Sequence, residues 1–111
     1  MDREEQPYMY GAVRIQNGKY KDQILILQKK EILWVGRDPG CCNLILEAPW
    51  ISRKHCSISC NEMQRNYIVV DYSENGVYLE NGMRLTKGKE NVLAADVVLI
   101  IGEQGTRLHL L

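Results

Sequence analysis

Short apolar runs separated by turn residues recur along the whole chain, and this pattern constrains the fold more than any other feature. The runs lie at residues 10–15, 23–27, 31–35, 44–46, 55–60, 67–71, 77–79, 97–101 and 106–110. Turn sequences stand between them, among them Asn17-Gly18, Asp38-Pro39-Gly40, Asn75-Gly76 and Asn81-Gly82. Asn-Gly pairs favour hairpin turns because both residues tolerate a positive φ. Regularly spaced short strands of this kind predict an all-β fold, a sandwich or a barrel.

The patterning within the runs predicts how the strands are covered. Residues 24–27 and 97–101 are apolar throughout, so we expect central strands or strands covered on both faces, whereas residues 107–110 alternate and fit a strand with one wet face. Alternation in residues 56–60 places Cys56 and Cys60 on the inward face with Ile58. Residues 89–95 are expected to form a turn of helix.

Length and charge limit the class of protein. A chain of 111 residues is the size of one domain with one core, and its 45% hydrophobic and 25% charged residues are those of an ordinary globular protein. Fourteen basic residues balance fourteen acidic ones, which argues against binding nucleic acid or a membrane with the whole surface. No apolar stretch is long enough to span a bilayer, and residues 1–7 lack the apolar segment of a signal peptide. We therefore expect a cytoplasmic protein.

The four cysteines are expected to be reduced. A secreted disulfide scaffold normally carries an export signal, and this sequence has none. His55 and His109 could join the thiols in a zinc site, but the chain holds no C-x2-C pair. Buried thiols that behave as small hydrophobic groups are the simpler interpretation, and no metal or cofactor is predicted.

Three loop segments carry a resemblance to a known family. They are Val35-Gly36-Arg37-Asp38, Ile51-Ser52-Arg53-Lys54-His55 and Asp71-Tyr72-Ser73-Glu74-Asn75-Gly76. Their order and spacing resemble the forkhead-associated (FHA) domain, a β-sandwich of two twisted, largely antiparallel sheets that binds phosphothreonine peptides with loops at one apex. The resemblance runs from about Gly11 to Leu111. It implies one FHA-like domain over residues 1–111, with residues 1–8 as a loosely ordered lead.

The resemblance implies a role for each site residue. Arg37, Ser52 and Arg53 would bind the phosphate and Asn75 the peptide backbone. A guanidinium group suits the first task because its planar fork of donors matches phosphate geometry. Gly36, His55 and Gly76 would support the site, and Trp50, Asn81 and Met83 are candidates for peptide selectivity. Lys54 is interpreted as a solvated basic residue.

The sequence departs from the family pattern at three places. Val77 stands where the family usually has Thr, Glu74 stands where small or hydroxylated residues are frequent, and one extra residue precedes Asn81-Gly82. A carboxylate at position 74 would repel a phosphate if it pointed inward. These changes leave the fold expectation unaltered and bear on affinity.

The implied function is recognition of a phosphothreonine segment of a partner protein in Ser/Thr-kinase signalling. The alternative is a phosphate-independent interaction or oligomerisation scaffold of the same fold. An enzyme is not expected: Ser52 and His55 could serve as nucleophile and base, but no orienting acid and no nucleophile elbow accompany them. We expect the chain to be a domain of a larger protein, with no nucleic-acid partner and no membrane insertion.

Overall fold

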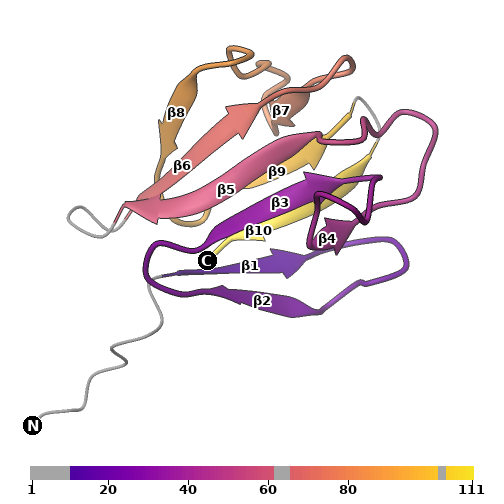
Figure 1. Cartoon of the computed structure of the whole chain (residues 1–111). Helices are drawn as coiled ribbons and strands as arrows, with labels where there is room; N and C mark the ends of the chain where they lie inside the picture. The colour runs from indigo at the N-terminus through magenta and orange to yellow at the C-terminus, as the bar shows by residue number, and fades with distance from the viewer. Residues whose placement is uncertain (1–10, 62–65, 103–104) are drawn as a thin grey trace, which may run out of the picture.

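The computed structural model describes residues 11–61, 66–102 and 105–111, and these ranges contain ten strands and no helix (Figure 1). The all-β prediction is confirmed. The strands are β1 (Gly11–Ile15), β2 (Ile24–Leu27), β3 (Ile32–Gly36), β4 (Leu44–Ile45), β5 (Cys56–Asn61), β6 (Asn66–Asp71), β7 (Val77–Leu79), β8 (Glu90–Leu93), β9 (Val98–Ile101) and β10 (Thr106–Leu110). Most expected runs become strands with ends shifted by a residue.

The strands form two five-stranded sheets that face each other as a sandwich (Figure 1). One sheet has the order β2-β1-β10-β9-β7 and the other β4-β3-β5-β6-β8. Every pairing is antiparallel except that of β3 with β4. Alternate residues of the facing strands fill one core, as expected for sheets packed face to face. Among its fully buried members are Ile15, Val35, Ile58, Val69, Leu99, Ile101 and Leu108.

The inward placement of the strand cysteines is confirmed. Cys56 and Ile58 are fully buried, and Cys60 is partly buried and packs against the same core. All four cysteines of the chain are free thiols. Burial raises the pKa of Cys60 to about 11 and raises that of Cys56 further, so both stay protonated as small apolar groups.

Two predictions are wrong, one of a turn of helix and one of a covered strand, and both concern strands at sheet edges. Residues 89–95 form no helix. Residues 90–93 of this segment form β8 instead, which pairs with β6 and satisfies the backbone hydrogen bonds along the outer edge of β6. The continuously apolar β2 is an edge strand that pairs only with β1, and Ile24 and Ile26 are 47% and 53% exposed. An apolar run does not by itself specify a second covering layer. The similar run in β9 does lie inside its sheet, between β10 and β7.

The Asn75-Gly76 turn joins β6 to β7, which belong to different sheets, so it is a crossover between the layers and not a hairpin. Gly76 has a φ of +93°. The loops that follow β3, β4 and β6 meet at one end of the sandwich, on the right in Figure 1.

Within the described ranges, no helix is long and apolar enough to cross a membrane. The lead expected at residues 1–8 lies outside the described residues.

Candidate functional site

Arg37 lies in the loop after β3 and is fixed to the loop before β5 by its backbone and side chain. Its backbone N–H donates to the carbonyl oxygens of Ser52 and Arg53, at 3.0 and 3.1 Å. Its Nε donates to the carbonyl oxygen of Ile51 at 3.1 Å. The remaining guanidinium nitrogens belong to an exposed side chain. The base of the side chain is thus oriented while its fork of donors stays available to a ligand.

Arg37 and Arg53 line an open cleft of about 350 Å³ together with Asp38 and Pro39. Both arginine residues are exposed. Asp38 turns one carboxylate oxygen to the backbone N–H of Gly40, at 2.8 Å. Two permanent positive charges at one small cleft are suited to an anion with several acceptor oxygens, such as a phosphate group.

Lys54 follows Arg53 in sequence but is engaged elsewhere. Its Nζ lies 4.5 Å from the ring centre of Trp34 and 5.6 Å from that of Tyr72. The two rings are themselves 5.9 Å apart. Lys54 therefore forms cation–π contacts with this aromatic pair and is not among the residues that line the cleft.

Ser52 lies between the Arg37 loop and the loop that follows β6. Its Oγ accepts a hydrogen bond from the backbone N–H of Glu74 at 3.2 Å. A hydroxyl group that accepts keeps its own hydrogen for donation to another acceptor. The Glu74 side chain is exposed, so this departure from the family pattern contributes its backbone to the site.

His55 is fully buried and joins the two loops beneath Ser52. Its Nδ1 accepts the backbone N–H of Ser52 at 3.1 Å, which assigns the ring proton to Nε2. Nε2 then donates to the carbonyl oxygen of Gly76 at 2.8 Å. Burial lowers the pKa of His55, an effect that its bond to Gly76 partly offsets, so the neutral ring is the stable form in the folded protein.

Asn75 is exposed, and its Nδ2 donates to the carbonyl oxygen of Trp50 at 3.0 Å. The turn behind it is held by buried polar groups. Ser73 Oγ accepts the Gly76 N–H at 2.7 Å and donates to Asp71 Oδ1 at 2.6 Å. Asp71 Oδ1 also accepts the backbone N–H of Ser73 at 2.8 Å. This network fixes the conformation of the turn that presents Asn75.

Arg84 belongs to this region although the sequence analysis did not select it. Its Nη2 lies 3.7 Å from the buried Asp71 Oδ2, an oxygen without a hydrogen-bond partner. The same Nη2 donates to the carbonyl oxygens of Ser73 and Glu74, each at 3.4 Å. The placement of Arg84 follows from the bridge between Tyr78 and Arg84 after the second Asn-Gly turn. The Asn81-Gly82 pair indicates a hairpin turn at this place, but nothing in the local sequence indicates that the Arg84 side chain reaches Asp71.

The selectivity candidates separate into two places. Trp50 is 41% exposed and packs against Gly102 and Gly105, and a Cβ on Gly102 would be 2.6 Å from its ring. It is joined to the site through Asn75. Asn81 and Met83 lie together at the turn after β7, where Asn81 Oδ1 accepts the Met83 N–H at 2.9 Å. No hydrogen bond among the described residues joins these two to the Arg37 cleft.

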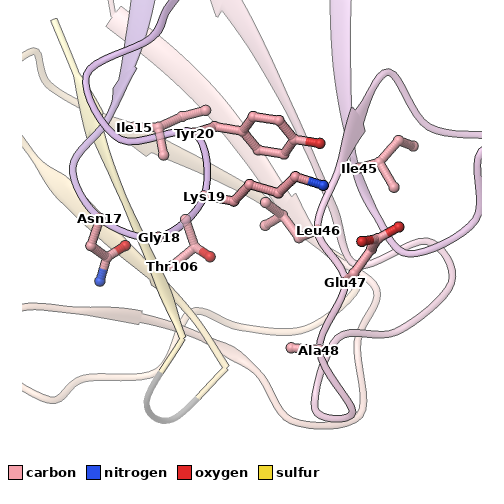
Figure 2. Close-up of a pocket in the computed structure, with 10 residues that line it drawn as sticks. All are labelled: Ile15, Asn17, Gly18, Lys19, Tyr20, Ile45, Leu46, Glu47, Ala48 and Thr106. Atoms are coloured by element: carbon pink, nitrogen blue, oxygen red, sulfur yellow. The ribbon is translucent and has the colours of Figure 1, made fainter.

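A second, smaller pocket of about 180 Å³ lies between the β1–β2 loop and residues 45–48, which comprise the end of β4 and the segment after it. Figure 2 shows Lys19 and Tyr20 extending from the first toward Ile45 and Leu46 of the second. None of the residues lining this pocket lines the Arg37 cleft.

Comparison with known structures gives the same fold. The MEK1 FHA domain is 29% identical, with a TM-score of 0.79 over 93% of this chain and 89% of that one. The same domain in complex with a phosphothreonine peptide of HOP1 is 28% identical, with a TM-score of 0.77 over 93% and 96%. The N-terminal FHA domain of Rad53p from S. cerevisiae, solved with a phosphothreonine peptide, is 23% identical, with a TM-score of 0.73 over 90% of each chain. No curated protein sequence matches the chain.

The family model of the FHA domain matches residues 33–102. This match covers more than half of the chain and includes all three loop segments that carried the resemblance. FHA domains are interaction modules, and the chain belongs to the FHA domain family.

Proposed function

We propose that this domain binds a phosphothreonine-containing segment of a partner protein, with Arg37, Ser52 and Arg53 on the phosphate and Asn75 on the peptide backbone. The observation that carries the proposal is the open cleft lined by the two exposed arginines Arg37 and Arg53, with the bases of the loops fixed by backbone hydrogen bonds. A phosphate brings close to two negative charges and three acceptor oxygens. A preorganised cationic cleft loses little freedom when it binds such a group.

Each donor has a distinct part. Arg37 would form a two-pronged contact with the phosphate, because its backbone and Nε are already engaged and its outer nitrogens are exposed. Ser52 would donate its hydroxyl hydrogen, since its oxygen already accepts from Glu74. The Asn75 amide nitrogen donates to the Trp50 carbonyl oxygen, which leaves Asn75 Oδ1 to accept a hydrogen bond from a peptide N–H. Two of the neighbouring structures hold phosphothreonine peptides, which supports the assignment.

The proposal includes the setting of the domain. A phosphothreonine ligand requires a Ser/Thr kinase that modifies the partner. Four free thiols suit the reducing cytoplasm. We propose that the domain is one part of a larger signalling protein.

A fluorescence-anisotropy titration with degenerate peptide libraries fixed at phosphothreonine, phosphoserine or unmodified threonine tests the function. We expect saturable binding to the phosphothreonine library that weakens as salt is raised. Arg37→Ala should lower the affinity at least tenfold, because charge-assisted hydrogen bonds contribute about 1.5–3 kcal/mol. Lys54→Ala is the matched control, because it removes the same charge from a neighbouring position outside the cleft.

Failure of the folded protein to bind any library would overturn the proposal. A phosphate-independent scaffold, the alternative class, predicts a partner contact that Arg37→Ala leaves unchanged.

A further inference from the structure

The β3–β4 loop carries two adjacent thiols, and the same loop contributes Asp38 and Pro39 to the Arg37 cleft. Cys41 and Cys42 follow Arg37 by four and five residues, and their sulfur atoms are 3.7 Å apart. Cys41 is exposed and Cys42 is partly buried. The backbone N–H groups of both donate to the carbonyl oxygen of Asp38, at 3.2 and 3.0 Å. The loop therefore closes on itself and holds the two thiols in contact.

Cys42 contacts the backbone that positions Arg37. Its Sγ lies 3.2 Å from the carbonyl oxygen of Arg53. That same oxygen accepts the backbone N–H groups of Arg37 and Asp38, at 3.1 and 3.2 Å. There is little free space around this contact, because a Cβ added to Gly36 would overlap the Arg53 oxygen and lie 2.8 Å from Cys42 Sγ. The Cys42 sulfur is therefore packed directly against the oxygen that holds the backbone of Arg37 and Asp38.

We propose that Cys41 and Cys42 form a thiol modification site, which a peroxide closes to a disulfide between adjacent residues, and that closure weakens ligand binding at the Arg37 cleft. The assignment of the modification site rests on the geometry of the two thiols. The effect of disulfide closure on ligand binding rests on the proposed function of the cleft.

The chemistry requires a peroxide as the oxidant, and each step balances. The Cys41 thiolate attacks one oxygen of hydrogen peroxide: an S–O bond forms, the O–O bond breaks and, with a proton, water leaves. The Cys42 sulfur then attacks the Cys41 sulfur: an S–S bond forms, the S–O bond and the Cys42 S–H bond break, and the thiol proton joins the departing hydroxide as a second water. In sum, two thiols lose two electrons and two protons, and one peroxide is reduced to two waters.

The environment of each cysteine sets the order of these steps. Burial and the neighbouring Cys41 raise the pKa of Cys42 to about 11, so Cys42 remains a thiol while the exposed Cys41 meets the oxidant. Cys56 is fully buried and cannot meet it. Cys60 is partly buried and has no sulfur partner among the described contacts.

Closure has to deform the loop. A disulfide places its sulfur atoms about 2.0 Å apart, so the two sulfurs must approach by about 1.7 Å from their present 3.7 Å. Adjacent Cα atoms are about 3.8 Å apart, closer than the roughly 4.4–6.8 Å usual for a disulfide. The bond is therefore strained and easily reduced, as expected of a reversible regulatory disulfide in the cytoplasm.

Mass spectrometry of the whole protein tests the modification. Reduced protein is treated with hydrogen peroxide and the reaction is quenched. The mass of the intact protein is then measured, and the modified peptide is identified after proteolysis. We expect the loss of two hydrogen atoms in the peptide that contains Cys41 and Cys42, and its reversal by dithiothreitol. Cys41→Ser and Cys42→Ser should each abolish this loss, whereas the matched variant Cys60→Ser should keep it. Oxidation of Cys41 to a sulfinic acid without the disulfide would overturn the proposal.

Two further measurements test the effect on the cleft. The affinity for a phosphothreonine peptide should fall about fivefold or more on oxidation and recover with dithiothreitol. Amide hydrogen exchange at Arg37 and Asp38 should accelerate in the oxidised protein, because both amides donate to the Arg53 oxygen.

The outcomes separate the two proposals. Peptide binding that is equal in both redox forms would overturn the regulatory effect and leave the proposed function intact. If the reduced protein binds no phosphopeptide, the proposed function and the effect on ligand binding fail together. The mass loss and the exchange rates then still decide whether the thiol site exists and reaches the cleft backbone.

Discussion

The imidazole of His55 donates through Nε2 to the carbonyl oxygen of Gly76 at 2.8 Å, joining residues that directly precede β5 and β7 in opposite sheets. The bond is buried, and the other ring nitrogen accepts from Ser52. His55 thus joins the loop that carries Ser52 to the turn that carries Asn75, together with the hydrogen bonds Glu74 N–H to Ser52 Oγ and Asn75 Nδ2 to the Trp50 carbonyl oxygen. This pair of bonds requires the neutral ring, because one ring nitrogen accepts while the other donates.

His55 should therefore make the protein less stable at acidic pH. Burial lowers its pKa in the folded state, so the unfolded chain binds the proton more readily. The stabilisation is fully present above the ordinary histidine pKa of about 6.5 and is lost as the pH falls from there through the folded-state value. Urea denaturation at a series of pH values between about 7.5 and 5 should show the free energy of unfolding decreasing.

The second histidine provides the control for this measurement. His109 is the only other histidine of the chain and lies on the partly exposed β10. His109→Gln should retain the acid-dependent loss of stability, and His55→Gln should remove most of it. The same pH slope in both variants would contradict the assignment to His55.

Gly76→Ala should destabilise the protein more than Gly82→Ala. The two glycines have nearly the same backbone conformation, with φ of +93° and +90°, so the strain of a side chain is similar, about 1–2 kcal/mol. They differ in surroundings: a Cβ at Gly76 would lie 2.8 Å from Arg84 Nε and from the Tyr78 ring, whereas Gly82 has nothing within 4 Å. We expect an additional loss of about 1–3 kcal/mol at Gly76, measured by urea denaturation. Equal losses would contradict the tight packing.

Much of the fold follows from the sequence, because turn residues and period-two alternation are local signals. The alternation of β5 correctly placed Cys56 and Ile58 in the core. The exposed β2 and the pairing of β8 with β6 could not be predicted in this way. Whether a strand lies at an edge depends on which strands pair, and pairing joins segments distant in the sequence.

The residues of the candidate site were likewise predictable only where local motifs indicate them. The loop motifs indicated Arg37, Ser52 and Asn75 as candidates, and the structure brings them to one end of the sandwich. The motifs did not indicate Arg84, which approaches the buried Asp71 only through a hairpin bridge. Contacts made by long side chains across a turn depend on the folded path of the chain.

Arg84 and Asp71 should be energetically coupled. Asp71 is fully buried and has one oxygen without a hydrogen bond, and Arg84 Nη2 lies 3.7 Å from that oxygen. Arg84→Ala should cost about 1–2 kcal/mol, less than for a fully buried pair because Arg84 is partly exposed. A double-mutant cycle with Asp71→Asn should give a coupling energy of about 0.5–1.5 kcal/mol. Additive losses would mean that the two groups do not interact.

Lys54 should contribute to stability and not to phosphopeptide affinity, in contrast to Arg53. Its Nζ lies 4.5 Å from the Trp34 ring centre, and the Tyr72 ring lies beside it. An exposed cation–π contact is worth about 0.5–1 kcal/mol. Lys54→Met keeps most of the aliphatic stem and should lose about that amount in urea denaturation. Anisotropy titration with a phosphothreonine peptide should give the same affinity for Lys54→Met as for the unaltered protein, and a weaker one for Arg53→Met. A matching loss of affinity in both variants would show that the ligand responds to the total charge of the loop and not to the residues that line the cleft.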